Sequence, residues 1–421
     1  MPVAAAHAPD GTGDAGRARA RALGAAVVAV VAGAVYLPAM ASVGLRTDTA
    51  AHLRFAGSMA LTGREYGPYY LFEQLTIIVR ALIPFGALSK VAPSLGDPAT
   101  IWDVSGMVVL LAFVAGLAVL VDLRLAGDLD RAGARHARTW AGVLTICLLL
   151  VAPVTVLTWH RHQLLVGYIS VTSFESATVI VARPLALALF WVVADRMWSR
   201  QPARVVAATA ALSLVALHAK PSYAICLLPA TGLFVAWRWW RDRGVDPRMW
   251  WWGFAVPSVV GLVYQVAVSR GQGGIGVAPF EIVRQLLESR GLSAWWFLPL
   301  LALSVLFPAV VAVVERDHVR ASRSTGLAWA AFAVGIAVFC TFTVTGRRDY
   351  GDLVWGPQIG LFVLMVESAR LAAVAGVERA RAAHRTRPDA RTLVVGAALA
   401  LHVLCGLVLW YHEIVEPAAW W

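Results

Sequence analysis

The sequence predicts an all-α polytopic integral membrane protein with about 11 transmembrane helices. Three observations predict this class. Of the 421 residues, 59% are hydrophobic and only 14% are charged, whereas roughly a quarter of the residues in a soluble domain are charged. Apolar runs of about 18 to 23 residues recur along the chain, each long enough to cross a hydrocarbon core of about 30 Å as a helix. The runs are continuous rather than alternating, which excludes a transmembrane β-barrel.

The expected elements follow one another along the whole chain. A cytoplasmic basic tail, residues 1–23, precedes the first crossing at residues 24–44. Ala39-Met40-Ala41 would also suit cleavage of a signal peptide, but about 21 apolar residues favour an uncleaved helix. Residues 205–237 should form two short helices that meet at His218-Ala219-Lys220-Pro221-Ser222. The other crossings are expected at residues 101–123, 139–158, 177–197, 250–269, 294–314, 326–345, 353–375 and 392–413.

The distribution of basic residues decides the topology. If residues 74–92 crossed the membrane, every later loop would change sides. If they form an amphipathic juxtamembrane helix within an external loop at residues 45–100, the cytoplasmic segments hold 23 of the 36 Lys and Arg residues, as the positive-inside rule requires. We therefore expect one transmembrane domain, residues 24–414, in the cell (plasma or inner) membrane, with a cytoplasmic amino terminus. A second amphipathic segment, residues 270–293, and the tail, residues 415–421, should be external.

The composition also restricts the partners. The net charge of +11 would suggest nucleic acid in a soluble protein, but here most of the basic residues serve as orientation signals and contacts to membrane lipids, so no nucleic-acid partner is expected. Cys147, Cys226, Cys340 and Cys405 all lie in apolar runs without a CxxC pair, which favours small core residues over a metal site. Motifs of soluble enzymes, such as GxGxxG before a helix, HExxH and GxSxG, are absent.

The informative residues of a membrane protein are ionisable ones outside its cytoplasmic segments. Asp48 follows the first crossing, in a run with Arg46, Thr47 and Arg54, and His52 follows at i+4, on the same face if the segment is helical. Such a pair suits a general base, and it could also supply part of a divalent-metal site. No metal ligand set is complete, so the cofactor stays open, with a divalent cation as one alternative. Thr47 or Asp48 could instead cap a helix, a role compatible with function.

Several cations are candidates for binding a phosphate. Arg183 lies inside a crossing and needs an anionic partner, either Glu175 or a lipid phosphate. Lys220, with His218 beside it, lies at the break of the helix pair and either binds phosphate or extends to the interface. An outer loop contains further candidates, Arg347-Arg348-Asp349-Tyr350-Gly351-Asp352, which either bind phosphate or pair internally. Glu367 lies midway through a crossing and should face the protein interior.

These features resemble the GT-C superfamily of integral membrane glycosyltransferases, in which an acidic residue follows the first crossing. Arg46-Thr47-Asp48-Thr49-Ala50-Ala51-His52 and the helix at 74–92 occupy the corresponding places. A group of GT-C-like proteins carries motifs similar to three further elements, which together extend the resemblance over residues 24–240: Tyr168-Ile169-Ser170 with Phe174-Glu175-Ser176-Ala177-Thr178, Arg183-Pro184-Leu185-Ala186, and Lys220-Pro221-Ser222-Tyr223. Glu175 and Ser176 stand where that group has His and Asn, so the roles of those two side chains do not carry over.

The resemblance implies an inverting hexosyl- or pentosyltransferase that moves a sugar from a polyprenyl-phosphate donor to a cell-envelope glycan or lipid acceptor on the outer face. Asp48 would be the catalytic base, with His52 beside it, and Arg183 and Lys220 would lie near the donor phosphate. Two other functions stay open. One is a lipid or anionic-solute transporter or flippase, because broken helices and buried charges also mark transport paths. The other is a non-catalytic subunit, or a polymerase or ligase, of cell-surface glycan assembly.

Overall fold

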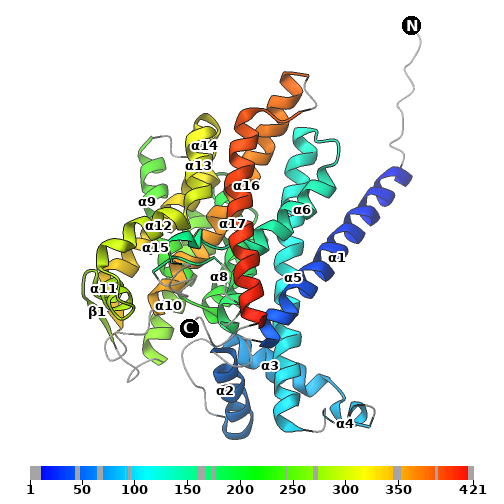
Figure 1. The fold of residues 1–421 in the computed structure, drawn as a ribbon, viewed down its shortest axis with the longest axis vertical. Coiled ribbons are helices and arrows are strands. Elements are labelled where there is room, and N and C mark those ends of the chain that lie inside the picture. The colour runs from blue at the N-terminus through cyan, green and yellow to red at the C-terminus, as the bar shows by residue number, and fades with distance from the viewer. Residues whose placement is uncertain are drawn as a thin grey trace.

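The chain is an all-α multi-pass membrane protein, as the sequence predicts, and Figure 1 shows its helices packed into one bundle. A computed structural model gives this architecture. It describes residues 11–42, 48–63, 70–90, 92, 94, 97–158, 167–171, 174, 176–241, 244–268, 274–344, 352–384 and 387–415.

The helices of the first half surround the site discussed below. They are α1 (Gly11–Ser42), α2 (Asp48–Thr62), α3 (Leu71–Leu82), α4 (Phe85–Leu88), α5 (Pro98–Ala132), α6 (Ala137–Leu150), the 3₁₀ turn η3 (Thr155–Leu157), α7 (Ala177–Arg196), α8 (Ala203–Ala219) and α9 (Ser222–Arg241).

The second half is also helical. It contains the π-helix η5 (Met249–Ala255), α10 (Val256–Val268), α11 (Glu281–Glu288), the 3₁₀ turn η6 (Ala294–Trp296), α12 (Phe297–Ser304), α13 (Leu306–Val314), α14 (Arg316–Ala321), α15 (Arg323–Thr341), the 3₁₀ turn η7 (Asp352–Val354), α16 (Trp355–Ala382) and α17 (Ala390–Val415). Two short antiparallel strands, β1 (Ile275–Val277) and β2 (Phe342–Val344), pair with Gly276 opposite Thr343.

Within the described part of the chain, eight helical segments are long and apolar enough to cross a membrane, and the pair α12 and α13, bent by 57°, makes up to nine. The shorter apolar helix α8 and the helix α9 coincide with the expected double segment at residues 205–237. Each expected crossing thus overlaps a helix, while the total of about 11 crossings stays a prediction. The helix α3 is too short to be among the spans, and so is α11, which buries Ile282, Val283 and Leu287 on one face.

Local sequence signals set the ends of the longest helix, α5. The side chain of Asp97 accepts a hydrogen bond from the backbone N–H of Thr100 at 2.9 Å, and Pro98 stands at the first helical position, where its missing N–H costs nothing. At the other end Gly133 adopts φ of 82°, a left-handed conformation that glycine adopts without steric cost. Because the helix continues to Ala132, its last turns carry four charged residues, Arg124, Asp128, Asp130 and Arg131.

The helices α7 and α16 form the centre of the bundle, and most of their residues are buried. They run from one end of the bundle to the other, so their two ends mark two separate polar regions. The first, which we call the α2–α3 end, contains α2 and α3 (bottom of Figure 1), and contacts of His218 and Lys220 add the end of α8 and the beginnings of α7 and α16. The second, the basic end, contains residues 124–138, 196–204, 238–241, 244–248, 316–323, 370–384 and 387–391, which contact one another, together with the beginning of α1.

Candidate functional site

The candidate site begins with Asp48, the first residue of α2. An acidic residue in the first turn favours helix formation there, because the carboxylate lies near the positive end of the helix dipole. One turn later Nε2 of His52 lies 3.6 Å from Oδ1 of Asp48, which confirms that the two residues share a helix face. The Asp48 side chain is 43% exposed, whereas His52 is 12% exposed. The carboxylate is therefore the accessible member of the pair.

A second carboxylate, that of Glu73 on α3, holds His52 from the other side. Oε1 of Glu73 lies 2.5 Å from Nδ1 of His52, and the Glu73 side chain is fully buried. The imidazole ring also packs edge-on against the rings of Phe55 and Phe72. His52 thus lies between two carboxylates, one buried and one exposed, and it joins α2 to α3.

This surrounding keeps His52 protonated at neutral pH. Burial lowers the pKa of the imidazole, but the hydrogen bonds and charges of Asp48 and Glu73 outweigh that effect and raise the pKa to about 9. For Asp48, burial raises the pKa of the carboxyl, while its interactions with His52, Lys220 and Ser176 lower it more, so that the net shift is downward. Asp48 is consequently ionised, which is the form that a general base requires.

Lys220 brings two further helices to the same place. It follows the last residue of α8, and its Nζ donates a hydrogen bond to Oγ1 of Thr178 on α7 at 2.7 Å. The ammonium also lies 4.8 Å from the ring centroid of Trp355, the first residue of α16, in a cation–π contact. Its attraction to Asp48 is one cause of the lowered pKa of that carboxyl. Four elements, α2, α7, α8 and α16, therefore meet at one charged cluster.

Polar contacts beside this cluster attach α3 to α8 and α10. Nε2 of His218 lies 3.1 Å from Oε1 of Gln74, and the His218 ring packs edge-on against Tyr70 at 4.6 Å between centroids. The hydroxyl of Tyr70 in turn lies 3.2 Å from that of Tyr264 on α10. His218 therefore belongs to the edge of the site and positions α3, which carries Glu73.

Arg183 occupies a different part of α7. It is 2% exposed, donates a hydrogen bond to the carbonyl oxygen of Val171, and interacts with the hydroxyl of Tyr36 on α1. Its guanidinium carbon also lies 5.6 Å from the ring centroid of Phe362. Among the described residues, the contacts of Arg183 thus go to α1, α16 and the segment before α7, whereas the charge of Lys220 acts on Asp48. The expected ion pair with Glu175 falls outside the described residues, as do Arg347 and Arg348.

Sequence reasoning missed several members of the cluster. Glu73, Gln74 and Trp355 were not singled out, and Thr178 was named only within a motif, although Glu73 is the one carboxylate of the mainly apolar helix LFEQLTIIVRAL. That isolation was the available signal, because a charged group on an apolar segment beside a membrane needs a partner. Its partner, His52, lies 21 positions away and could not be identified from spacing.

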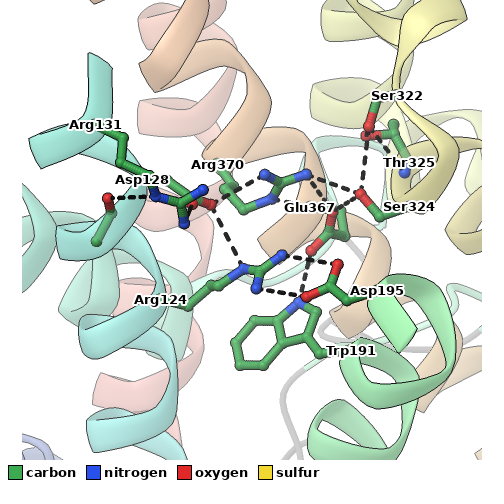
Figure 2. A network of polar contacts seen from close by, with 11 residues as sticks. Arg124, Asp128, Arg131, Trp191, Asp195, Ser322, Ser324, Thr325, Glu367 and Arg370 are labelled. Carbon is green, nitrogen blue, oxygen red and sulfur yellow. Dashed lines mark hydrogen bonds and ion pairs between the residues drawn. The ribbon is translucent and has the colours of Figure 1, made fainter. Parts of the chain in front are cut away.

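Glu367 faces the interior, as predicted, but it belongs to a second network at the basic end (Figure 2). Its Oε1 accepts a hydrogen bond from Nε1 of Trp191 at 2.7 Å, and its Oε2 accepts one from Oγ of Ser324 at 2.6 Å. Arg370 joins Glu367, at 2.9 Å, to Asp128, at 3.0 Å. Arg124 and Arg131 also contact Asp128, and Arg124 makes two hydrogen bonds to Asp195, so three arginines balance three carboxylates. A network with balanced charge joins helices and leaves no net charge to attract an ion.

Within the described part of the chain, no group of three or more His, Cys, Asp or Glu residues is arranged to hold a metal ion. The cluster at the α2–α3 end consists of one exposed and one buried carboxylate, a protonated imidazole, an ammonium and two hydroxyl groups, and it is suited to proton transfer and to binding an anion through the ammonium. The chain matches no protein-family model and no curated protein.

Proposed function

We propose that this protein is a membrane glycosyltransferase of the GT-C type, with about 11 crossings, which transfers a sugar from a polyprenyl-phosphate donor to a glycan or lipid acceptor. The observation that carries the proposal is the position of Asp48. It is a half-exposed carboxylate at one end of a membrane bundle, paired with His52 and within the electrostatic influence of the Lys220 ammonium. The resemblance of residues 24–240 to GT-C proteins supports the proposal, because Asp48 and Lys220 match an acidic residue and a lysine of the motifs of those proteins.

The proposed reaction is a single displacement. The acceptor hydroxyl oxygen attacks the anomeric carbon, the bond from that carbon to the phosphate oxygen breaks, and the polyprenyl phosphate leaves with the bonding electrons. Asp48 accepts the hydroxyl proton, and Lys220 stabilises the negative charge on the departing phosphate. Attack opposite the leaving group inverts the configuration at the anomeric carbon. Because prenyl phosphate is a good leaving group, positioning and charge neutralisation are sufficient for catalysis.

The proposal also assigns roles to His52 and Arg183. His52, held by Glu73, positions Asp48 and keeps it ionised. The resemblance implies that Arg183 lies near the donor phosphate. Its buried contacts with Tyr36 and Val171 support a role in holding α7 in position beside the donor.

The test is the variant Asp48→Asn, assayed in membranes that receive a panel of polyprenyl-phosphate hexoses and pentoses. Transfer should fall by about 100-fold or more, because a general base typically contributes that much. The matched control is Asp97→Asn. Asp97 is an exposed carboxylate that caps α5, and asparagine also caps helices, so this variant should retain transfer. Equal activity of Asp48→Asn and the parent protein would refute the assigned base.

A transporter is the second candidate, favoured by the 57° bend between α12 and α13, since broken helices also occur in transport proteins. Proteoliposomes distinguish the two functions. A glycosyltransferase consumes the donor and forms a glycosylated product, whereas a transporter moves its substrate into the vesicles without donor consumption.

A further inference from the structure

A groove between α7 and α8 lies at the basic end, far along α7 from the candidate site. It has a volume of about 630 Å³. Its apolar wall is formed by Val192 on α7 and by Val205, Ala208 and Leu212 on α8. The wall follows α8 for two turns, so it runs from the polar end of the helix toward the apolar middle of the bundle.

Two arginines, Arg196 and Arg204, line the groove where α7 ends and α8 begins, and both side chains are exposed. None of the described residues that line it is Asp or Glu. Two carboxylates lie beside the lining residues, and both are already hydrogen-bonded within the protein. Asp195, next to Arg196 in the sequence, binds Arg124 through both oxygens, at 2.7 and 3.1 Å. Asp246 accepts hydrogen bonds from the backbone N–H groups of Gln201, which lines the groove, and of Arg248. The groove therefore combines an apolar wall with a positively charged rim.

A larger cavity at the basic end, about 750 Å³ between α5, α6 and α16, differs from the groove because an acidic residue lines it. It contains a carboxylate, that of Asp389, which pairs with Arg379 at 2.8 Å. Arg379 also pairs with Glu315 at 2.6 Å. The charges of that cavity are largely neutralised within the protein, whereas those of the α7–α8 groove are available to an external anion.

We propose that the α7–α8 groove binds one anionic phospholipid of the surrounding bilayer. The phosphate lies between Arg196 and Arg204, which can each offer two N–H groups to it, and an acyl chain lies against Val192, Ala208 and Leu212. From Arg204 to Leu212 the helix rises by roughly 12 Å, which leads from the head-group layer into the hydrocarbon layer. A zwitterionic lipid is disfavoured, because its ammonium group is repelled by the same two arginines.

The experiment uses the full-length protein in detergent, incubated with equal amounts of phosphatidylglycerol and phosphatidylcholine that carry identical acyl chains. Native mass spectrometry then counts the retained lipids. The parent protein should retain one phosphatidylglycerol. The double variant Arg196→Gln/Arg204→Gln should lower that retention by about 30-fold, because each of the two arginines near an anionic lipid contributes about 1 kcal/mol. Arg200→Gln is the matched control, since Arg200 is exposed in the same connection but does not line the groove, and it should change nothing.

A second pair of variants tests the apolar wall without changing charge. Ala208→Trp fills the groove and should remove the bound phosphatidylglycerol, whereas Ala207→Trp, on the neighbouring exposed position outside the groove, should retain it. Equal retention of the two lipids by the parent protein would overturn the proposal. So would an equal loss in Arg200→Gln and the double variant, or undiminished retention by Ala208→Trp.

Discussion

Nδ1 of His52 lies 2.5 Å from Oε1 of Glu73, a contact that joins α2 to α3 across 21 residues. Glu73 is fully buried, and a buried carboxylate is costly unless a cation or hydrogen-bond donors compensate it. His52 supplies both the charge and the donor, and its other nitrogen faces the exposed Asp48. The imidazolium thereby links the stability of the α2–α3 end to the position of the proposed catalytic base.

The first prediction concerns the pH dependence of stability. The pKa of His52 is about 9 in the folded protein, compared with about 6.5 for an unperturbed histidine. A group with a raised pKa stabilises the fold fully below its unfolded pKa and loses that contribution as the pH rises through the folded pKa. The melting temperature should therefore fall between about pH 6.5 and 9, and the full effect of this shift on the free energy of unfolding is about 3 kcal/mol.

The variant Glu73→Gln tests whether the raised pKa of His52 causes this pH dependence of the melting temperature. Glutamine has a similar shape but no charge, so the pKa of His52 should move down and the fall in melting temperature with pH should become shallower. Glu288→Gln also removes one carboxylate, but from an exposed pair with Arg284 on α11, and should preserve the slope. Identical slopes in Glu73→Gln and Glu288→Gln would contradict the assignment.

The helices and one part of the site could be predicted from the sequence. Hydrocarbon thickness requires about 20 apolar residues for each crossing, so runs such as residues 101–123 and 177–197 predict helices without knowledge of their neighbours. The sequence also predicts that Asp48 and His52 share a helix face, because this depends only on their spacing of four residues within one helix.

The remaining contacts depend on how distant segments pack. Glu73 becomes a site residue only because α3 folds back on α2, and Arg370 meets Asp128 across 242 residues. Neither pairing has a signal in residue spacing. The sequence did predict that Glu367 must face the interior, since hydrocarbon excludes an isolated charge, but several arginines could equally have been its partner.

The second prediction concerns Lys220, a residue that is 4% exposed and whose ammonium donates a hydrogen bond to Thr178. If it also stabilises the donor phosphate, Lys220→Met should lower kcat/KM for a polyprenyl-phosphate sugar by about tenfold or more, the value of a charge-assisted hydrogen bond. The chain offers a matched control, because its other lysine, Lys90, is exposed after α4. Steady-state kinetics of Lys90→Met should equal those of the parent protein. A parent-like kcat/KM in Lys220→Met would remove Lys220 from the mechanism.

The third prediction concerns the network in Figure 2. Arg370 is 16% exposed and compensates the buried Glu367 and Asp128. Arg370→Met should reduce the free energy of unfolding by about 3 kcal/mol, since loss of one partner leaves an uncompensated buried charge. Arg131 contacts the same Asp128 but is 74% exposed, so Arg131→Met should cost less than about 1 kcal/mol. Thermal unfolding in detergent measures both. Similar losses in the two variants would mean that burial does not determine the strength of these pairs.

The fourth prediction uses two glycines of α17 that differ only in their surroundings. A methyl group added at Gly406 would overlap the carbonyl oxygen of Leu150, and the backbone there is fixed by a hydrogen bond from the N–H of Ala152 to the carbonyl of His402 at 3.1 Å. A carbonyl cannot move aside as a flexible side chain can, so Gly406→Ala should displace α17 from the end of α6 and lower the melting temperature.

Gly396 is the matched control, because it has nothing within 4 Å of the added methyl group. Gly396→Ala should therefore stabilise the helix by up to about 1 kcal/mol, the difference in helix propensity between the two residues. If both variants raised the melting temperature, α17 would not pack closely against the end of α6. Alanine at position 406 can stabilise the helix through its higher helix propensity only if the space around that position is open.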